Sequence, residues 1–134
     1  MIEEIYRSAR QGLDFSFEST LSGMTHRNVI RDIRRLGYSA HLFFLWLPDE
    51  DLALSRIRSR VAGGGHDVAA DIVRRRFGRS LKNFFIYREL VDSWMLIDNS
   101  GPEPTVIASQ QHQTLRIINQ TTYDRLRLQF EAES

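Results

Sequence analysis

The sequence predicts an α/β fold built on a mostly parallel β-sheet. Amphipathic segments long enough for helices alternate along the chain with short apolar segments long enough for strands. Residues 41–47 form a nearly unbroken apolar run, which is typical of a strand buried on both faces of a parallel sheet, and residues 94–98 form a second such run. No internal repeat or interdomain linker interrupts this alternation, so we expect a single domain over residues 1–134.

The predicted helices follow from apolar residues that recur at three and four positions, together with the residues that begin or end each segment. Thr25 is a suitable N-cap, and Pro48 followed by Asp49 is a suitable helix start. Gly12 and Gly37 are suitable helix ends. The helices are expected over residues 2–12, 25–36, 49–62 and 69–90, with a last one capped by Thr121 or Thr122.

Strands are predicted where apolar residues alternate with polar ones or run together. Phe15 and Phe17 alternate with Ser16 and Glu18, which predicts a short strand over residues 14–19 with Glu18 close to its carboxyl end. The remaining strands are expected over residues 41–47, 94–98, 105–109 and 114–118.

The composition narrows the range of functions. The 134 residues are 42% hydrophobic and 26% charged, as in a globular domain, and the formal charge of +1 is not that of a nucleic-acid-binding protein. The chain has no cysteine, and its four histidines have no recognised ligand spacing, so we predict no metal site. The first residues lack the pattern of a secretion signal and no apolar run is long enough to cross a bilayer, so we expect a cytoplasmic protein without a membrane partner.

Basic residues are concentrated between residues 52 and 88, where nine Arg and Lys residues are accompanied by only two aspartates. Two arginine-rich helices on either side of the glycines at 63–65 predict a movable clamp for phosphate. A guanidinium group binds two phosphoryl oxygens at once, and glycine can act as a hinge. His66, beside the glycines, is a further candidate. The alternative is that these arginines form an ordinary solvated helix face.

A second candidate site follows the strand predicted at 14–19. Glu18 is followed by the hydroxyls of Ser19, Thr20 and Ser22, at a turn from strand to helix. Ligands of open α/β sheets bind at the carboxyl edge of the strands, where this turn would lie. The alternative is that the hydroxyls cap the helix and Glu18 is merely exposed.

Asp98 and Asn99 end the strand predicted at 94–98, and they either reach a ligand at the same edge or form a simple turn. His41 fits a packed or hydrogen-bonded strand residue better than a ligand-binding one. The G-x-x-x-x-G-K-[ST] phosphate loop does not occur, because the glycines at 63–65 follow a predicted helix and are not followed by Lys and Ser or Thr.

Five segments, taken in order, carry a family resemblance. They are Phe15–Gly23, Gly37–Pro48, Arg60–Val68, Arg74–Phe77 and Asp98–Gly101. Across roughly residues 1–109, they resemble the carboxyl-terminal half of the zeta-toxin-like P-loop kinases. Members of this family are ATP-dependent small-molecule kinases, and the best-known ones phosphorylate UDP-N-acetylglucosamine and act as toxins paired with an antitoxin. The resemblance implies a partial P-loop-kinase-like three-layer sandwich, a nucleotide-sugar type of substrate, ATP and Mg²⁺ as cofactors, and an antitoxin as one candidate partner.

The resemblance also implies roles for single residues. Glu18 and Thr20 match the substrate-binding Glu-x-Thr motif of the family, and Ser22 stands where the toxins have an arginine. Arg60 matches an arginine that stabilises the transferred phosphoryl group. A second lid arginine has no single match, and His66 or one of the arginines at 74–76 would take its place. We assign catalysis to Arg60, His66 and Arg75, substrate binding to Glu18, Thr20 and Ser22, and cofactor binding to Arg74, Asp98 and Asn99.

The nucleotide-binding half of the family has no counterpart in this sequence. In the family, the first strand, the phosphate loop with its lysine and the segment with the catalytic aspartate precede the helix that corresponds to residues 2–12. We therefore expect no kinase activity from this chain alone. In the family fold the first strand lies between the strands matched by 14–19 and 41–47. Either these two strands close that gap, or a partner chain or self-association completes the sheet.

Three functions remain open from the sequence. The first is a truncated zeta-toxin-like kinase domain that keeps its substrate and lid regions. The second is a non-catalytic assembly module completed by a partner chain. The third is a basic clamp for nucleotides or nucleic acid, although no specific nucleic-acid partner is predicted.

Overall fold

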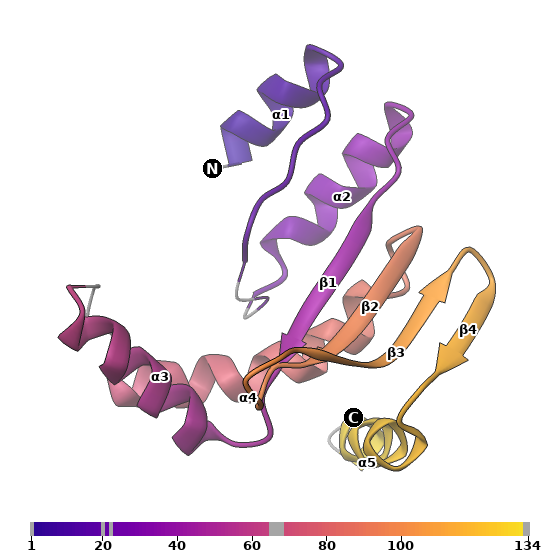
Figure 1. Cartoon of the computed structure of the whole chain (residues 1–134). Coiled ribbons are helices and arrows are strands. Elements are labelled where there is room, and N and C mark those ends of the chain that lie inside the picture. The colour runs from indigo at the N-terminus through magenta and orange to yellow at the C-terminus, as the bar shows by residue number, and fades with distance from the viewer. Residues whose placement is uncertain (1, 20, 22, 65–68, 133–134) are drawn as a thin grey trace.

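The computed structural model describes residues 2–19, 21, 23–64 and 69–132, and it confirms the α/β class. These ranges form five helices and one four-stranded sheet, arranged as in Figure 1. The helices are α1 (Ile2–Arg10), α2 (Thr25–Arg35), α3 (Glu50–Ala62), α4 (Ala70–Tyr87) and α5 (Gln120–Ala132). The strands are β1 (His41–Trp46), β2 (Ser93–Asp98), β3 (Thr105–Gln111) and β4 (Thr114–Ile117).

The sheet is mixed, so the expectation of a mostly parallel sheet is wrong. Its strand order is β1-β2-β3-β4, with β1 parallel to β2 and both other pairs antiparallel. The reason lies in the connections. Two helices separate β1 from β2 and return the chain to the end of the sheet where β1 begins, so β2 runs parallel to β1. Short turns join β2 to β3 and β3 to β4, and each turn reverses the direction of the chain.

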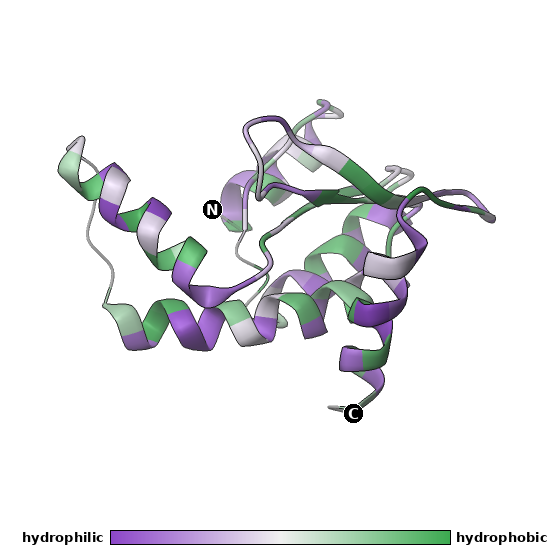
Figure 2. Cartoon of the chain, turned by 60° about the horizontal axis from the view of Figure 1, so that its bottom comes forward, coloured by the Kyte–Doolittle hydropathy of each residue, from purple (hydrophilic) through white to green (hydrophobic). Residues whose placement is uncertain are grey.

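The main core lies on one face of the sheet, against α4 and α5, which Figure 2 shows beneath the strands. Phe84 of α4 is fully buried at its centre, and its ring contacts the rings of Phe44 in β1 and Trp94 in β2. On the opposite face of the sheet, the side chains of Phe43 and Leu45 are 66% and 57% exposed. The expectation that this strand is buried on both faces is therefore wrong, because in the described ranges helices pack on only one face of β1.

Residues 14–19 are the second departure from the predicted strands. They do not form a strand, and within the described part of the chain their backbone makes no backbone–backbone hydrogen bond. The alternation of Phe15 and Phe17 is present, but a strand also needs a neighbouring strand to pair with, and none in the described ranges lies beside them. Both rings pack instead against the amino-terminal helices, where Phe15 contacts Tyr38 and Phe17 stacks on His26.

A smaller core joins α1 to α2. Ile5 of α1 is buried against Val29 and Ile33 of α2. The Tyr6 hydroxyl donates a hydrogen bond of 2.6 Å to the Asp32 carboxylate, and this bond raises the pKa of the Tyr6 hydroxyl. These contacts hold α1, and the segment that follows it, to α2 and not to the sheet.

Helix ends agree with the sequence in part. The carboxylate of Asp49 accepts a hydrogen bond from the Leu52 amide, so the predicted start of α3 is confirmed. Thr25 is the first helical residue of α2 and not its cap. The cap of α5 is the side chain of Asn119, two residues before the expected Thr121. In the described ranges, no helix has the length and apolarity needed to span a bilayer.

Candidate functional site

A large cleft separates residues 15–19 from β1. Its volume is about 1540 Å³. One wall is formed by Phe15–Ser19 and the other by β1 with the residues on either side of it. Figure 1 shows the two walls running in the same direction, and α2 connects the end of the first wall to the start of the second, with Ile30 and Ile33 lining the cleft. The cleft exists because residues 14–19 are held to α1 and α2, whereas β1 is held to β2.

The floor of the cleft is tied to α4 by two buried polar side chains. The Asn83 amide donates a hydrogen bond to the carbonyl of Leu21, and the Tyr87 hydroxyl donates one of 2.9 Å to the carbonyl of Gly23. Burial raises the pKa of the Tyr87 hydroxyl, so this group stays a neutral donor over the physiological pH range. These two bonds fix the backbone at Leu21 and Gly23 against the helix.

Arginines from α3 and α4 line the cleft beyond the carboxyl end of β1. Arg56 and Arg60 come from α3, which begins directly after β1, and Arg76 comes from α4. The guanidinium of Arg56 donates to the carbonyl of Ser100, just after β2, at 3.3 Å. In the described residues Arg60 and Arg76 have no ion-pair partner, so their guanidinium groups are available to an anion.

The cleft carries a net positive charge. Four arginines line it, the fourth being Arg125 of α5, whose guanidinium lies 5.8 Å from the ring centroid of Trp46. Two carboxylates, Glu18 and Glu50, also line it. Arg74 lies 3.8 Å from Glu50, which offsets one of these negative charges. The arrangement favours an anionic ligand whose charge lies at the carboxyl end of β1.

Three predicted site residues meet at this cleft. Glu18 is exposed on the wall formed by residues 15–19, Arg60 lies on α3, and Asn99 follows β2. They are distant in the sequence, and only the fold brings them to one cavity. Their placement agrees with the expectation that the ligand lies at the carboxyl edge of the parallel strands.

Three other predicted residues that the structure describes do not line the cleft. Arg74 lies near Glu50 and Asp51 at the start of α3, at 3.8 Å from each. The Asp98 carboxylate accepts hydrogen bonds from the backbone and hydroxyl of Ser100, which is the simple turn role. Arg75 is exposed on α4. Thr20, Ser22 and His66 lie outside the described residues.

The predicted ATP-binding residues are therefore not gathered at one place. Of Arg74, Asp98 and Asn99, only Asn99 lines the cleft, and the other two are engaged by neighbouring side chains or backbone. The donor set that cradles nucleotide phosphates, a glycine-rich loop with its lysine, is missing from the sequence as well. As a group, Arg74, Asp98 and Asn99 do not fit ATP with Mg²⁺.

Sequence reasoning found some of the cleft arginines only as members of a group. Arg56 and Arg76 belong to the basic region at 52–88, but nothing in the spacing distinguishes them from Arg58 or Arg79, which do not line the cleft. Arg125 lies beyond the resemblance and follows a strand hairpin. Its position beside Trp46 depends on how α5 folds back under the sheet, which no local pattern indicates.

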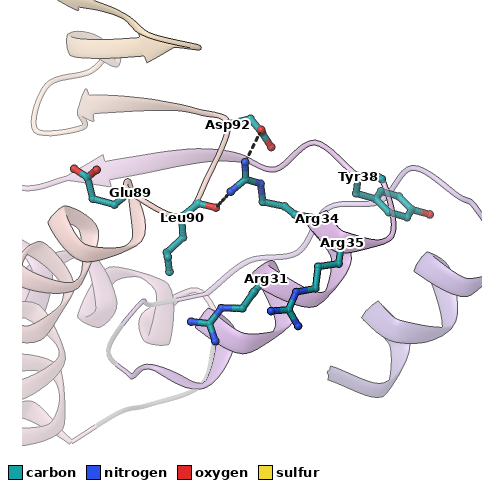
Figure 3. Close-up of a pocket in the computed structure, with 8 residues that line it drawn as sticks. Arg31, Arg34, Arg35, Tyr38, Glu89, Leu90 and Asp92 are labelled. Atoms are coloured by element: carbon teal, nitrogen blue, oxygen red, sulfur yellow. Dashed lines mark hydrogen bonds and ion pairs between the residues drawn. The ribbon is translucent and has the colours of Figure 1, made fainter.

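A second, smaller cavity of about 460 Å³ lies at the opposite end of the parallel strands. Figure 3 shows Arg31, Arg34 and Arg35 extending from α2 beside it. The guanidinium of Arg34 already donates hydrogen bonds to the Asp92 carboxylate and to the carbonyl of Leu90, so its role is structural. This cavity lies at the carboxyl end of α2, where the helix dipole is unfavourable to an anion, so it is a weaker anion site than the cleft.

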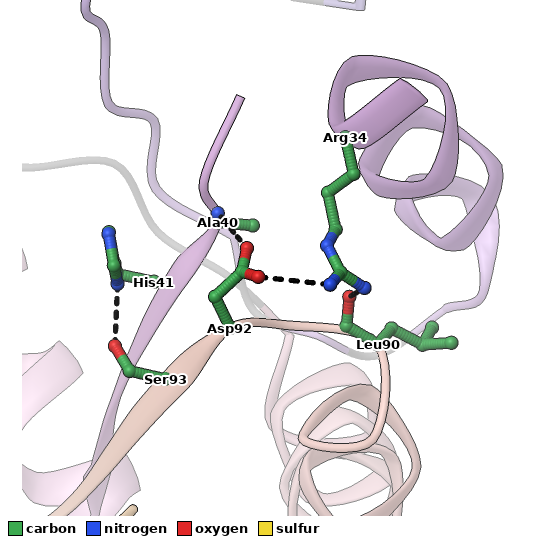
Figure 4. A network of polar contacts seen from close by, with 6 residues as sticks. All are labelled: Arg34, Ala40, His41, Leu90, Asp92 and Ser93. Atoms are coloured by element: carbon green, nitrogen blue, oxygen red, sulfur yellow. Dashed lines mark hydrogen bonds and ion pairs between the residues drawn. The ribbon is translucent and has the colours of Figure 1, made fainter. Parts of the chain in front are cut away.

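Asp92 joins three elements at that end, as Figure 4 shows. Its carboxylate accepts a hydrogen bond of 2.7 Å from the Ala40 amide, directly before β1, and one of 2.9 Å from Arg34. The Ala40 hydrogen bond, and after it Arg34, hold the pKa of the Asp92 carboxyl below its ordinary value. Asp92 thus fixes the start of β1 relative to β2 and α2, and through β1 it fixes one wall of the cleft.

Across the described ranges, no three His, Asp or Glu side chains lie close enough together to hold a metal ion.

Comparison with known proteins shows a similarity to a protein whose function is itself unassigned. The chain is 35% identical over 68 residues to an uncharacterized protein of Haemophilus influenzae, a match that covers 51% of this chain and 49% of that protein. The chain thus matches about half the length of this curated relative. No protein-family model matches the sequence, and no solved structure matches the chain.

Proposed function

We propose that the chain is the substrate and lid portion of a zeta-toxin-like kinase fold and that it binds a phosphorylated, anionic small molecule in the cleft. The observation that supports this most is the position of Arg56, Arg60 and Arg76 at the carboxyl end of β1. A guanidinium group in this position can donate two parallel hydrogen bonds to the oxygens of one phosphoryl group. Glu18, on the opposite wall, would accept hydrogen bonds from hydroxyl groups of the ligand.

In this proposal the chain transfers no phosphate by itself. It has residues that would stabilise charge on a phosphoryl group, but it lacks the loop that positions a nucleotide. A complete three-layer kinase fold would need ATP and Mg²⁺ to be held by a nucleotide-binding half that is not part of this sequence. The free outer edge of β1 favours a second candidate function, an assembly module completed by a partner chain.

Thermal melting with added ligands tests the anion site. A UDP-sugar such as UDP-N-acetylglucosamine is expected to raise the Tm, because a ligand that binds only the folded state stabilises it by about 2.7 kcal/mol at one hundred times its Kd. Mg·ATP at the same concentration is expected to leave the Tm unchanged. A rise with Mg·ATP and none with any UDP-sugar would contradict the proposal.

The matched control uses two arginines of α3. Arg60 lines the cleft, whereas Arg58 is exposed and does not. We expect Arg60→Gln to remove most of the Tm rise and Arg58→Gln to keep it, since loss of one charge-assisted hydrogen bond weakens binding by about tenfold or more. Equal Tm rises in the two variants would show that the ligand binds elsewhere.

A further inference from the structure

Leu21 has an unusual backbone conformation beside the cleft. Its φ is 53°, in the left-handed region that residues other than glycine rarely adopt. Such a conformation costs energy, so it persists only where the surrounding structure holds it, and residues of this kind cluster at binding and active sites. Leu21 itself lines the cleft, three residues after Glu18.

Three contacts hold Leu21 in this conformation. Its amide donates a hydrogen bond of 3.1 Å to the hydroxyl of Ser19, and its side chain is buried in the main core. Its carbonyl accepts a hydrogen bond from the side-chain amide of Asn83. Of the Asn, Gln, Ser, Thr and charged side chains in the described ranges, only that of Asn83 is buried. Burying an amide is unfavourable unless it is hydrogen-bonded, so the position of Asn83 is explained by its bond to Leu21.

Helix α4 presents Asn83 on the same side as a cleft arginine. Arg76 precedes Asn83 by seven positions and Tyr87 follows it by four, so the three residues lie along one side of the helix. Arg76 and Tyr87 both line the cleft, and the Tyr87 hydroxyl donates to the carbonyl of Gly23 at 2.9 Å. One side of α4 thus carries an anion-binding guanidinium and two donors that hold the backbone after Glu18.

We propose that Asn83 and Tyr87 are positioning residues, which act through the backbone at Leu21 and Gly23 to set Glu18 at a fixed place relative to Arg76. This inference rests on the proposed function, in which Arg76 binds a phosphoryl group and Glu18 binds hydroxyl groups of the same ligand. The Ser19 hydroxyl passes the effect from Leu21 to the neighbouring Glu18. The pair therefore determines specificity, because a ligand with both groups gains from the fixed spacing and a bare anion does not.

Isothermal titration of Asn83→Leu with two ligands tests this role. Leucine has nearly the shape of asparagine but has no donor for the Leu21 carbonyl. The Kd for UDP-N-acetylglucosamine is expected to rise about tenfold, whereas the Kd for pyrophosphate, which has no hydroxyl group, is expected to stay unchanged. Lys82→Leu, at the exposed neighbouring position, is the control and is expected to change neither Kd. Equal losses for both ligands, or no loss for either, would overturn the inference.

A double-mutant cycle separates positioning from a merely structural role. Glu18→Gln is expected to weaken binding of UDP-N-acetylglucosamine about tenfold in the original chain but by less than about twofold in Asn83→Leu, because the two residues act along one route. Fully additive effects would overturn the inference. If Asn83→Leu does not fold, Tyr87→Phe takes its place in the titrations and in the cycle, since it keeps the buried ring and removes only the bond to Gly23.

A measurement without ligand keeps this inference distinct from the proposed function. A positive φ brings the amide and α protons of one residue closer together than a negative φ does. Leu21 is therefore expected to give a strong intraresidue NOE between these protons in the original chain and a weak one in Asn83→Leu. If the original chain binds neither ligand, the proposed function fails and the NOE decides on its own whether Asn83 holds Leu21. A NOE of unchanged strength in Asn83→Leu would overturn the inference.

Discussion

Replacing Phe84 with alanine is expected to lower the free energy of unfolding by about 3–5 kcal/mol, which is at the upper end of what truncating one core side chain costs. Phe84 is fully buried, and its ring lies 5.0 Å from that of Phe44, 5.3 Å from that of Phe85 and 5.5 Å from that of Trp94. Truncation leaves a cavity between α4 and two strands. The surrounding rings belong to different elements and cannot move together to fill it. Urea unfolding followed by tryptophan fluorescence measures the change.

The control for this prediction is Phe43→Ala. Phe43 lies beside Phe44 in the same strand but on the opposite face, with 66% of its surface exposed. Its truncation is expected to change the free energy of unfolding by no more than about 0.5 kcal/mol. If both truncations cost the same, the packing of Phe84 against the inner face of β1, and the exposure of Phe43 on its outer face, would be contradicted.

Replacing Asp92 with asparagine is expected to cost about 1.5–3 kcal/mol at pH 7, because two hydrogen bonds to a charged acceptor are weakened. The folded-state pKa of the Asp92 carboxyl lies below its value in the unfolded chain. The stabilisation is therefore fully present above the unfolded pKa of about 3.9, and it is lost as the pH falls through the folded-state pKa. Urea unfolding at pH 7, 5 and 3 measures this.

The difference in the free energy of unfolding between Asp92→Asn and the original chain is thus expected to be constant between pH 7 and 5 and to shrink at pH 3 and below. Asp51→Asn serves as the control, since the Asp51 side chain is 89% exposed and lies 3.8 Å from Arg74. Such a surface pair contributes about 0–1 kcal/mol. A loss of unfolding free energy in Asp92→Asn that does not change with pH would mean that the packing of the side chain, and not its charge, holds β1 to α2.

Local patterns predicted most helices and strands because the formation of each of these elements depends on residues that are close together in the sequence. The run at 41–47 and the Asp49 cap are properties of a few consecutive side chains, and both elements formed where expected. The strand at 14–19 did not form, although the alternation of Phe15 and Phe17 is present. Strand formation depends on a partner strand, and the sequence pattern contains no information on whether that partner lies beside it.

The same reason explains what was missed at the candidate site. Arg60 was identified by resemblance, and it lies at the cleft together with Glu18 and Asn99. Arg125 was not identified, because its position depends on the packing of α5 beneath the sheet. An apolar run also cannot indicate whether a strand is central or at an edge. It also does not indicate whether helices cover both faces of the strand, so the exposure of Leu45 became apparent only from the structure.

The most direct test of the anion site is an NMR titration of the arginine side-chain Nε–Hε resonances with UDP-N-acetylglucosamine. We expect the resonances of Arg56, Arg60 and Arg76 to shift together with one Kd, while that of Arg58, on the same helix as Arg60 but outside the cleft lining, stays in place. Shifts confined to other arginines, or no shifts at saturating ligand, would contradict a phosphate-binding cleft at the carboxyl end of β1.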